Sequence, residues 1–414
     1  MDILRFITAG SVDDGKSTLI GRLLYDSKSI LVDQLEALEK QSKNKNEDGI
    51  DLAILTDGLR AEREQGITID VAYRYFATNK RKFIIADAPG HVQYTRNLVT
   101  GASNSQVMVI LIDARNGVTE QTRRHSIIAS LLKLQHIIVA VNKMDLMDYS
   151  QETYLKIKED YMKVADSLGL KEVSYFPISA MSGANIVEVS DKMPWYQGDS
   201  LLTHLESIEL KTETELNESR FQVQFVIRPQ TTELHDYRGY AGQIISGSYK
   251  VGDSIKVLPQ DISTTIAKIE VNGKEVEEVF TQQSCVIHLS EDIDVSRGDY
   301  LIKTDEIPQV QNEFSALLCW MDYKELTVGG KYFLQHHNRV VNAVIRQINK
   351  KIDVNTLERM DVTDPIKLNE VVSVEIKTAS PLVFDSFDKN QKTGSAILID
   401  QTSNSTVAAV MIQG

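Results

Sequence analysis

The sequence predicts an α/β domain, with a mostly parallel sheet and helices on both faces, followed by two all-β barrel domains. Short, nearly continuous apolar runs alternate with helical patterns over the first half of the chain. After a polar segment, short alternating runs separated by turn residues continue to the end. A chain of 414 residues is long for one domain, and we expect domains at 1–210, 218–306 and 310–414.

The strands of the first domain are predicted from five apolar runs rich in Val and Ile. Strands buried on both faces of a parallel sheet have this continuous hydrophobicity. The runs cover 3–10, 82–90, 107–114, 136–145 and 174–180. The clearest helical pattern covers 150–168 and follows Ser150, a suitable N-cap. Its apolar positions recur at helical spacing and are Tyr154, Ile157, Tyr161, Val164 and Leu168.

The second half of the chain has the pattern of β structure. The polar stretch 211–219 is typical of a linker. Asn272–Gly273 lies between two alternating runs and predicts a two-residue hairpin turn. A further boundary is expected within 303–313, after which alternating runs resume. We therefore expect two small barrels.

Composition excludes several classes of function. Lysine and arginine number 45 against 58 aspartates and glutamates, so the net charge is −13, and wholesale binding of nucleic acid is disfavoured. We find no run of eighteen apolar residues and no signal peptide, and we expect no membrane contact and a cytoplasmic location. The two cysteines, Cys285 and Cys319, lie in apolar runs and are expected to be buried and unreactive.

A phosphate-binding loop is predicted at the start of the chain, where residues 10–18 read GSVDDGKST. Its two glycines let backbone amides turn towards phosphate oxygens, Lys16 can reach the β and γ phosphates, and Ser17 can ligate Mg²⁺. The loop follows an apolar strand and precedes a helical pattern, which argues against a chance match. The residues expected to hold phosphate are Gly10, Ser11, Val12, Asp13, Asp14, Gly15, Lys16, Ser17 and Thr18.

Two further segments are candidates for sensing the γ-phosphate. In DAPGH, 87–91, Asp87 can hold Mg²⁺ through water, the Gly90 amide can meet a γ-phosphate, and His91 can face the attacking water. In REQGITID, 63–70, Thr68 can supply a second hydroxyl to Mg²⁺ while the triphosphate is bound. The alternative for this segment is a polar loop that enters a strand, and spacing alone does not decide between them.

The base is predicted from NKMD, 142–145, at the end of a strand. Asp145 can accept hydrogen bonds from N1 and the 2-amino group of guanine, a donor pair that adenine lacks. Asn142 can reach the base edge, and the stem of Lys143 can lie over the ring. Ser179–Ala180 also follows a strand and can present a backbone amide to guanine O6. The expected ligands are GTP or GDP with Mg²⁺.

With these motifs, the chain resembles the translational GTPase superfamily, the class of elongation factor Tu, in which a P-loop GTPase domain precedes two β-barrels. Longer stretches, such as DAPGHVQYTRNLVTGAS and MPWYQGDSLLTHLE, are similar to the GTPase (large) subunit family of bacterial sulfate adenylyltransferase, or ATP sulfurylase. The resemblance implies a separate small subunit that makes adenosine 5′-phosphosulfate and pyrophosphate from ATP and sulfate in sulfate assimilation. The resemblance further implies that GTP hydrolysis drives that uphill transfer and that the barrels help dock the partner, in a heterodimer or higher heteromer.

The resemblance also implies roles for individual residues. Ser17 and Thr68 would ligate Mg²⁺ with Asp87 in its outer shell, and His91 would orient the water. Ser11 and Asp14 replace histidines that are usual in elongation factor Tu, which points away from a translation factor. An elongation factor Tu-like translation GTPase remains the alternative, and a GTP-gated assembly protein without coupled chemistry is a third.

Two histidine-containing segments receive structural interpretations. His336 and His337 are adjacent on a predicted strand, so we expect their side chains on opposite faces and no shared metal. TRRH, 122–125, is expected on a solvated helix face.

Overall fold

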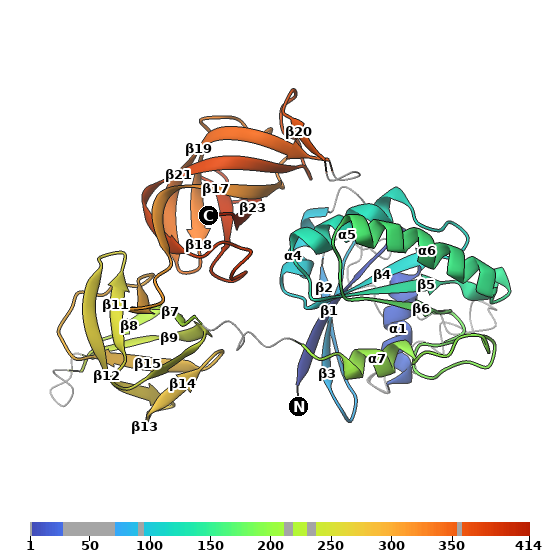
Figure 1. The fold of residues 1–414 in the computed structure, drawn as a ribbon, viewed down its shortest axis with the longest axis horizontal. Coiled ribbons are helices and arrows are strands. Elements are labelled where there is room, and N and C mark those ends of the chain that lie inside the picture. Colours follow the sequence, from blue (N-terminus) through green and yellow to red (C-terminus); the bar gives the residue numbers. More distant parts are fainter. Residues whose placement is uncertain (1, 28–70, 90–94, 211–217, 230–236, 354–357) are drawn as a thin grey trace. The chain divides into compact units, whose positions relative to one another are not determined.

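The computed structural model describes residues 2–27, 71–89, 95–210, 218–229, 237–353 and 358–414. It contains two compact units, and the chain passes from the first to the second between Leu210 and Lys211. We call them the α/β unit and the β unit and describe each by itself (Figure 1).

The α/β unit is built on a six-stranded sheet in the order β2-β3-β1-β4-β5-β6. β2 pairs antiparallel with β3, and the other neighbours are parallel. The strands are β1 (Ile3–Ala9), β2 (Ala72–Ala77), β3 (Lys82–Asp87), β4 (Val107–Asp113), β5 (His136–Asn142) and β6 (Val173–Pro177). The five predicted runs are β1 and β3 to β6. The edge strand β2 alternates instead, because one face of it is exposed: Tyr75 is 67% exposed.

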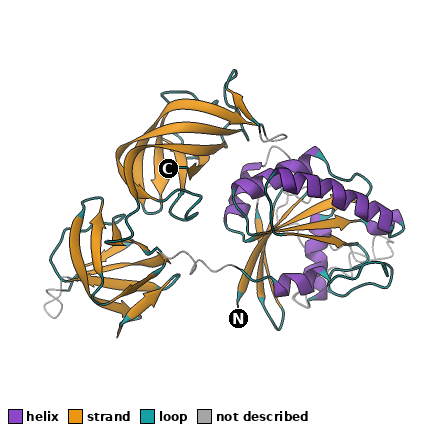
Figure 2. Cartoon of the chain, viewed as in Figure 1, coloured by secondary structure: helices purple, strands orange, loops and turns teal. Residues whose placement is uncertain are grey.

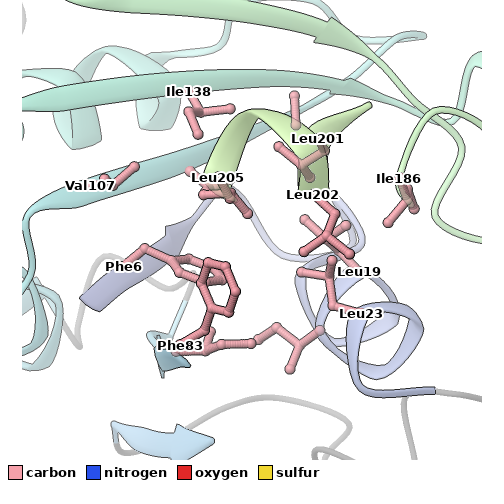
Figure 3. Close-up of a cluster of buried hydrophobic side chains, with 14 of the residues drawn as sticks. Phe6, Leu19, Leu23, Phe83, Val107, Ile138, Ile186, Leu201, Leu202 and Leu205 are labelled. Carbon is pink, nitrogen blue, oxygen red and sulfur yellow. The ribbon is translucent and has the colours of Figure 1, made fainter. Parts of the chain in front are cut away.

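Helices cover both faces of this sheet, as predicted. α1 and α7 lie on one face, and α4, α5 and α6 lie on the other (Figure 1). Their bounds are α1 (Lys16–Asp26), α4 (Thr95–Ser103), α5 (Glu120–Leu131), α6 (Gln151–Ser167) and α7 (Leu201–Ser207), with a short 3-10 helix, η3 (Met144–Met147). Leu19 and Leu23 of α1 and Leu202 and Leu205 of α7 pack over Phe6 and Phe83 of the sheet, which forms a continuous apolar core (Figure 3).

The predicted helix at 150–168 is confirmed as α6. The Ser150 hydroxyl accepts a hydrogen bond from the Thr153 amide, which satisfies one amide of the first turn. Four of the five apolar positions are buried, namely Tyr154, Ile157, Tyr161 and Val164. The fifth, Leu168, is the C-cap and is half-buried.

The β unit contains two closed antiparallel barrels, which confirms the predicted fold class (Figure 2). In the first, pairing runs β11-β16-β7-β9-β15-β12 and closes between β12 and β11; in the second it runs β18-β22-β23-β17-β21-β19 and closes between β19 and β18. The first-barrel strands are β7 (Arg220–Gln222), β8 (Phe225–Ile227), β9 (Gly239–Ser246), β10 (Ser248–Lys250), β11 (Ser254–Leu258), β12 (Ile262–Val271), β13 (Lys274–Val276), β14 (Glu278–Phe280), β15 (Ser284–Leu289) and β16 (Tyr300–Lys303). The second-barrel strands are β17 (Gln309–Trp320), β18 (Lys331–His336), β19 (Arg339–Ile352), β20 (Arg359–Asp361), β21 (Val371–Phe384), β22 (Ser395–Asp400) and β23 (Thr406–Ile412).

Local details of the β unit confirm two predictions. Asn272 and Gly273 have φ of +52° and +73° and join β12 to β13, as a two-residue hairpin turn requires. Cys285 and Cys319 are both buried, and burial raises the pKa of each thiol to about 12, which keeps them protonated and unreactive.

The two barrels are joined by a buried ion pair. The Arg220 guanidinium of β7 donates from Nε and Nη2 to the two carboxylate oxygens of Asp385, which follows β21, at 2.8 and 2.9 Å. Arg220 is 1% exposed and Asp385 3%. Despite the burial of Asp385, hydrogen bonds and charge from Arg220 lower the pKa of its carboxyl.

The expectation that the side chains of His336 and His337 lie on opposite faces is wrong. β18 ends at His336, and His337 has a φ of +49°, so strand alternation does not apply to the pair. Both rings turn to the same backbone: Nε2 of His336 lies 2.7 Å from the Thr393 carbonyl oxygen, and Nε2 of His337 lies 2.9 Å from that of Lys392. Burial lowers the pKa of His336 to about 3, so it stays neutral.

Candidate functional site

The described parts of four predicted motifs, at 10–18, 87–89, 142–145 and 179–180, meet at the carboxyl edge of the α/β sheet. β1 ends directly before Gly10, β3 ends at Asp87, β5 ends at Asn142, and β6 leads through Ile178 into Ser179. Loops at the carboxyl ends of parallel strands gather at one edge of the sheet, where ligands of such folds bind. One edge of the sheet therefore collects residues that are far apart in sequence, from Gly10 to Ser179.

Gly15 shapes the phosphate loop. Its φ is +94°, a left-handed conformation that favours glycine, and it is the N-cap of α1 without a side-chain cap. A Cβ at this position would lie 2.4 Å from Nδ2 of Asn142, so the site excludes a larger residue on two grounds. The first amides of α1 have no capping side chain and are available to an anion.

Lys16 is held inside the loop. Its Nζ donates to the carbonyl oxygens of Gly10 at 3.0 Å and Ser11 at 2.8 Å, which leaves one of its three hydrogens for a further acceptor. The side chain is buried, and burial lowers the pKa of the ammonium, against the opposing charges of Asp87, Asp14 and Asp13. A phosphate oxygen would supply both the third acceptor and the missing solvation.

Asp14 supports the same loop with a carboxylate. Its Oδ2 accepts the Ser11 amide at 2.5 Å, and the residue is 4% exposed. Burial raises the pKa of this carboxyl, although the Ser11 hydrogen bond and the Lys16 charge favour ionisation.

Asn142 connects the phosphate loop to the segment after β6. Its Nδ2 donates to the Asp14 carbonyl oxygen at 2.8 Å, and its Oδ1 accepts the Ala180 amide at 2.9 Å. The second hydrogen of Nδ2 remains for a base edge. We expect the Ala180 amide to donate to guanine O6, but in this structure it already donates to Asn142 Oδ1. Its single hydrogen would have to be shared between the two acceptors.

Lys143 is positioned by a residue that the sequence analysis missed. Its Nζ lies 2.9 Å from Oδ2 of Asp113, which ends β4, and Arg115 binds the same carboxylate. Asp113 is buried, but the hydrogen bonds from Arg115 and Lys143 hold the pKa of its carboxyl well below the usual range. The sequence did contain a signal for Asp113: it is a carboxylate at the end of an apolar strand, the same pattern that pointed to Asp87.

Asp145 carries the strongest indication of a ligand. Its Oδ1 is buried and has no hydrogen-bond partner among the described residues. A buried carboxylate oxygen without a donor is costly, and native structures rarely leave one unpaired. Guanine N1–H and the 2-amino group would supply this donor, whereas adenine would not.

The residues present fit Mg²⁺ with a bound phosphate. Mg²⁺ prefers hard oxygen ligands in small number together with substrate phosphates. The Ser17 hydroxyl makes no hydrogen bond within the part of the chain that the structure describes, and Asp87 is a 2% exposed carboxylate whose Oδ1 accepts from Thr8. Thr68, Gly90 and His91, the other predicted members of the site, lie outside the described residues.

Comparison with known proteins places the chain in a family. Residues 1–211 match the elongation factor Tu GTP binding domain, and residues 313–413 match the GTP-eEF1A C-terminal domain-like family. Sulfate adenylyltransferase subunit 1 of Alteromonas mediterranea is 48% identical over 99% of this chain and 87% of its own length. The chain belongs to the sulfate adenylyltransferase subunit 1 family.

Other relatives agree with this assignment. The bifunctional enzyme CysN/CysC of Mycobacterium tuberculosis is 50% identical over 99% of this chain and 67% of its own length. Among solved structures, the GTP-bound Ski7 GTPase-like domain of S. cerevisiae aligns with a TM-score of 0.52 at 18% identity, over 99% of this chain and 97% of that one, which shows a shared fold alone.

In this subunit 1 family member, the segment 122–125 is more buried than the sequence analysis predicted. Thr122 and His125 of α5 are each 1% exposed, so the expected solvated face for TRRH is wrong for these two residues. Thr119 caps α5, and its hydroxyl lies 3.4 Å from that of Ser11 in the phosphate loop. Burial, with the nearby charges of Lys16 and Arg124, lowers the pKa of His125 to about 3, so it remains neutral.

No helix among the described segments of this family member is long and apolar enough to cross a membrane.

Proposed function

We propose that this chain binds GTP with Mg²⁺ at the carboxyl edge of its α/β sheet and hydrolyses it to drive sulfate adenylylation on a partner subunit. The partner, the small subunit, would transfer the adenylyl group of ATP to sulfate and release pyrophosphate. The observation that carries the proposal is the 46–49% identity to curated subunit 1 proteins over 99% of the chain. This full-length similarity favours the main hypothesis over a translation factor.

The phosphate loop and Lys16 bind the triphosphate. The amides of residues 10–18 surround the phosphates, and the remaining hydrogen of Lys16 Nζ faces the β and γ oxygens. Ser17, Thr68 and Asp87 would hold Mg²⁺, which when bound neutralises charge on the β and γ phosphates.

Guanine is read by three residues of the NKMD segment. Asp145 accepts from N1 and the 2-amino group, and Asn142 donates its remaining amide hydrogen to the base edge. Lys143, held by Asp113, lays its aliphatic stem against the ring. Ser179 and Ala180 complete the base pocket from the other side.

Hydrolysis depends on positioning more than on proton abstraction. Phosphoryl transfer has little covalent chemistry for a protein to perform, so we assign His91 to orienting the attacking water. Gly90 and Thr68 would respond to the γ-phosphate and change conformation when it leaves.

Coupling is required because the phosphate–sulfate anhydride is a high-energy bond. GTP hydrolysis supplies the free energy, and the two barrels dock the small subunit in a heterodimer or larger heteromer. We expect neither nucleic acid nor membrane as a partner, and we place the complex in the cytoplasm.

Reconstitution with the small subunit tests the proposal. The purified chain is mixed with that subunit, ATP, sulfate and GTP, and phosphosulfate and GDP are measured while each component is omitted in turn. Mutual dependence of the two products supports coupling. GTPase activity that responds only to ribosomes would establish the translation alternative, and GTP-dependent assembly without turnover would establish a gating protein; either result overturns the proposal.

A further inference from the structure

Arg22 connects the helix that begins at the phosphate loop to the segment that follows β6. From α1, its Nε donates to the carbonyl oxygen of Ala180 at 3.3 Å, and its Nη2 donates to that of Met181 at 2.6 Å. Its Nη1 lies 3.6 Å from the carboxylate of Asp26, one turn along the helix. A Cβ built on Gly183 would lie 3.7 Å from Cδ and Nε of Arg22, so the arginine side chain lies against this segment.

The segment 179–183 has one amide without an acceptor in the described structure. The amide of Met181 makes no hydrogen bond there. The other four amides are bonded within the protein: Ser179 to the Ala184 carbonyl, Ala180 to Asn142 Oδ1, Ser182 to Ser179 Oγ and Gly183 to the Ser179 carbonyl. Met181 therefore carries the available backbone donor of this segment.

Arg22 sets the direction of that donor. In a planar trans peptide the C=O of one residue and the N–H of the next point in opposite directions. When Arg22 holds the Ala180 carbonyl, the Met181 amide is turned away from the arginine. The second bond, to the Met181 carbonyl, fixes the following peptide in the same way, so the segment cannot rotate about either unit without losing an arginine contact.

We propose that Arg22 is a positioning residue for base recognition: it fixes the Ala180–Met181 peptide so that the Met181 amide reads the O6 atom of guanine. This inference rests on the proposed binding of guanine nucleotides. It assigns the recognition of O6 to the Met181 amide rather than to the Ala180 amide, which is bonded to Asn142. It also gives a role in base recognition to Arg22, a side chain that would contact neither the phosphates nor the base.

Base analogues separate this role from general support of the fold. The full chain is titrated with GDP, with 6-thio-GDP, in which sulfur replaces O6 and accepts hydrogen bonds weakly, and with IDP, which lacks the 2-amino group. The variants are Arg22→Ala, Arg22→Lys and, as a matched control, Arg123→Ala on the exposed surface of α5. Thermal melting shows that each variant is folded, and Arg22→Gln, which keeps one donor, replaces any Arg22 variant that is not.

In the wild type, the change from GDP to 6-thio-GDP is expected to weaken binding about fivefold to tenfold, the value of one hydrogen bond. In Arg22→Ala that penalty falls to about twofold or less, while the penalty for IDP, read by Asp145, is unchanged. Arg22→Lys retains part of the penalty, and Arg123→Ala matches the wild type.

Two results would overturn the inference. An Arg22→Ala chain that keeps the full 6-thio penalty would show that Arg22 does not position the O6 donor, even if GDP binds more weakly overall. A wild type that binds GDP and ADP alike would remove the guanine site itself, and the proposed function with it. If the wild type prefers GDP to ADP but Arg22→Ala keeps the full 6-thio penalty, the guanine site stands and only the role of Arg22 is rejected.

Discussion

Replacing Arg220 by alanine should destabilise the β unit more than any other single side-chain truncation that we predict. Arg220 uses all five of its N–H donors. Two bind Asp385, and the remaining three bind the carbonyl oxygens of Ser219 and Glu306 and the carboxylate of Glu218. Among the described residues, the variant leaves the buried Asp385 carboxylate with one side-chain donor, the Thr393 hydroxyl.

The expected loss follows from that uncompensated charge. Removing one partner of a buried ion pair costs about 3–5 kcal/mol, because the other charge stays in a low dielectric. The unpaired carbonyls add about 1 kcal/mol each unless water reaches them. We therefore predict a decrease of about 3–7 kcal/mol in the free energy of unfolding, with the lower values expected if water reaches both carbonyls. The double variant Arg220→Met, Asp385→Leu should lose clearly less than the sum of the two single variants, since no buried charge remains.

The loss should also depend on pH. The pKa of Asp385 is lowered in the folded state, so its pairing stabilises the protein above the unfolded pKa of about 3.9 and is lost as pH falls through the folded value. The difference between wild type and Arg220→Ala should therefore narrow below about pH 4.

Urea unfolding followed by Trp320 fluorescence measures this effect. Trp320 is buried in the second barrel, and a Trp195→Phe background removes the other tryptophan, which lies in the α/β unit. A shift of less than about 1 kcal/mol at pH 7 would refute the reasoning, because it would mean that the pair contributes no more than an exposed ion pair does.

Three further predictions concern the nucleotide site. Gly15→Ala should lower GTP affinity at least about 100-fold in calorimetry while the chain stays folded, because its φ of +94° and the 2.4 Å approach to Asn142 exclude a Cβ; an unchanged affinity would contradict this. His91→Ala should bind GTP nearly normally and hydrolyse it more slowly in single-turnover assays, and unaltered hydrolysis would remove His91 from the mechanism. Burial raises the pKa of Asp14, so the ionised carboxylate destabilises the folded state once the pH exceeds the pKa of this group in the unfolded chain. Asp14→Asn should therefore raise the melting temperature more at pH 7 than at pH 4. A larger increase at pH 4 than at pH 7 would contradict the direction of the pKa shift.

The sequence predicted the fold well where structure follows from local pattern. Buried parallel strands read as continuous apolar runs, Ser150 and the spacing of Tyr154, Ile157 and Tyr161 define α6, and Asn272–Gly273 gives a hairpin. In each case the controlling interactions lie within a few residues. Four motifs of the site were accessible for the same reason, since the phosphate loop, DAPGH, NKMD and Ser179–Ala180 each lie at the end of a strand, whereas REQGITID does not.

Features that depend on distant side chains could not be predicted. Nothing local to Arg220 or Asp385 indicates a pair 165 residues apart. The expectation for His336 and His337 failed because a strand end and a positive φ are not visible in the residue types. The bond from Ala180 to Asn142, which leaves Met181 as the available amide, likewise required the tertiary structure.

Calorimetric titration of the isolated chain with GTP and ATP in the presence of Mg²⁺ tests the guanine site most directly. The wild type should bind GTP at least about 100-fold more tightly than ATP, because Asp145 gains two donors from guanine and none from adenine. Asp145→Asn should lose GTP affinity and gain affinity for xanthosine triphosphate, whose 2-oxo group accepts from an amide. Equal affinity for GTP and ATP in the wild type, or unchanged GTP affinity in Asp145→Asn, would contradict the account.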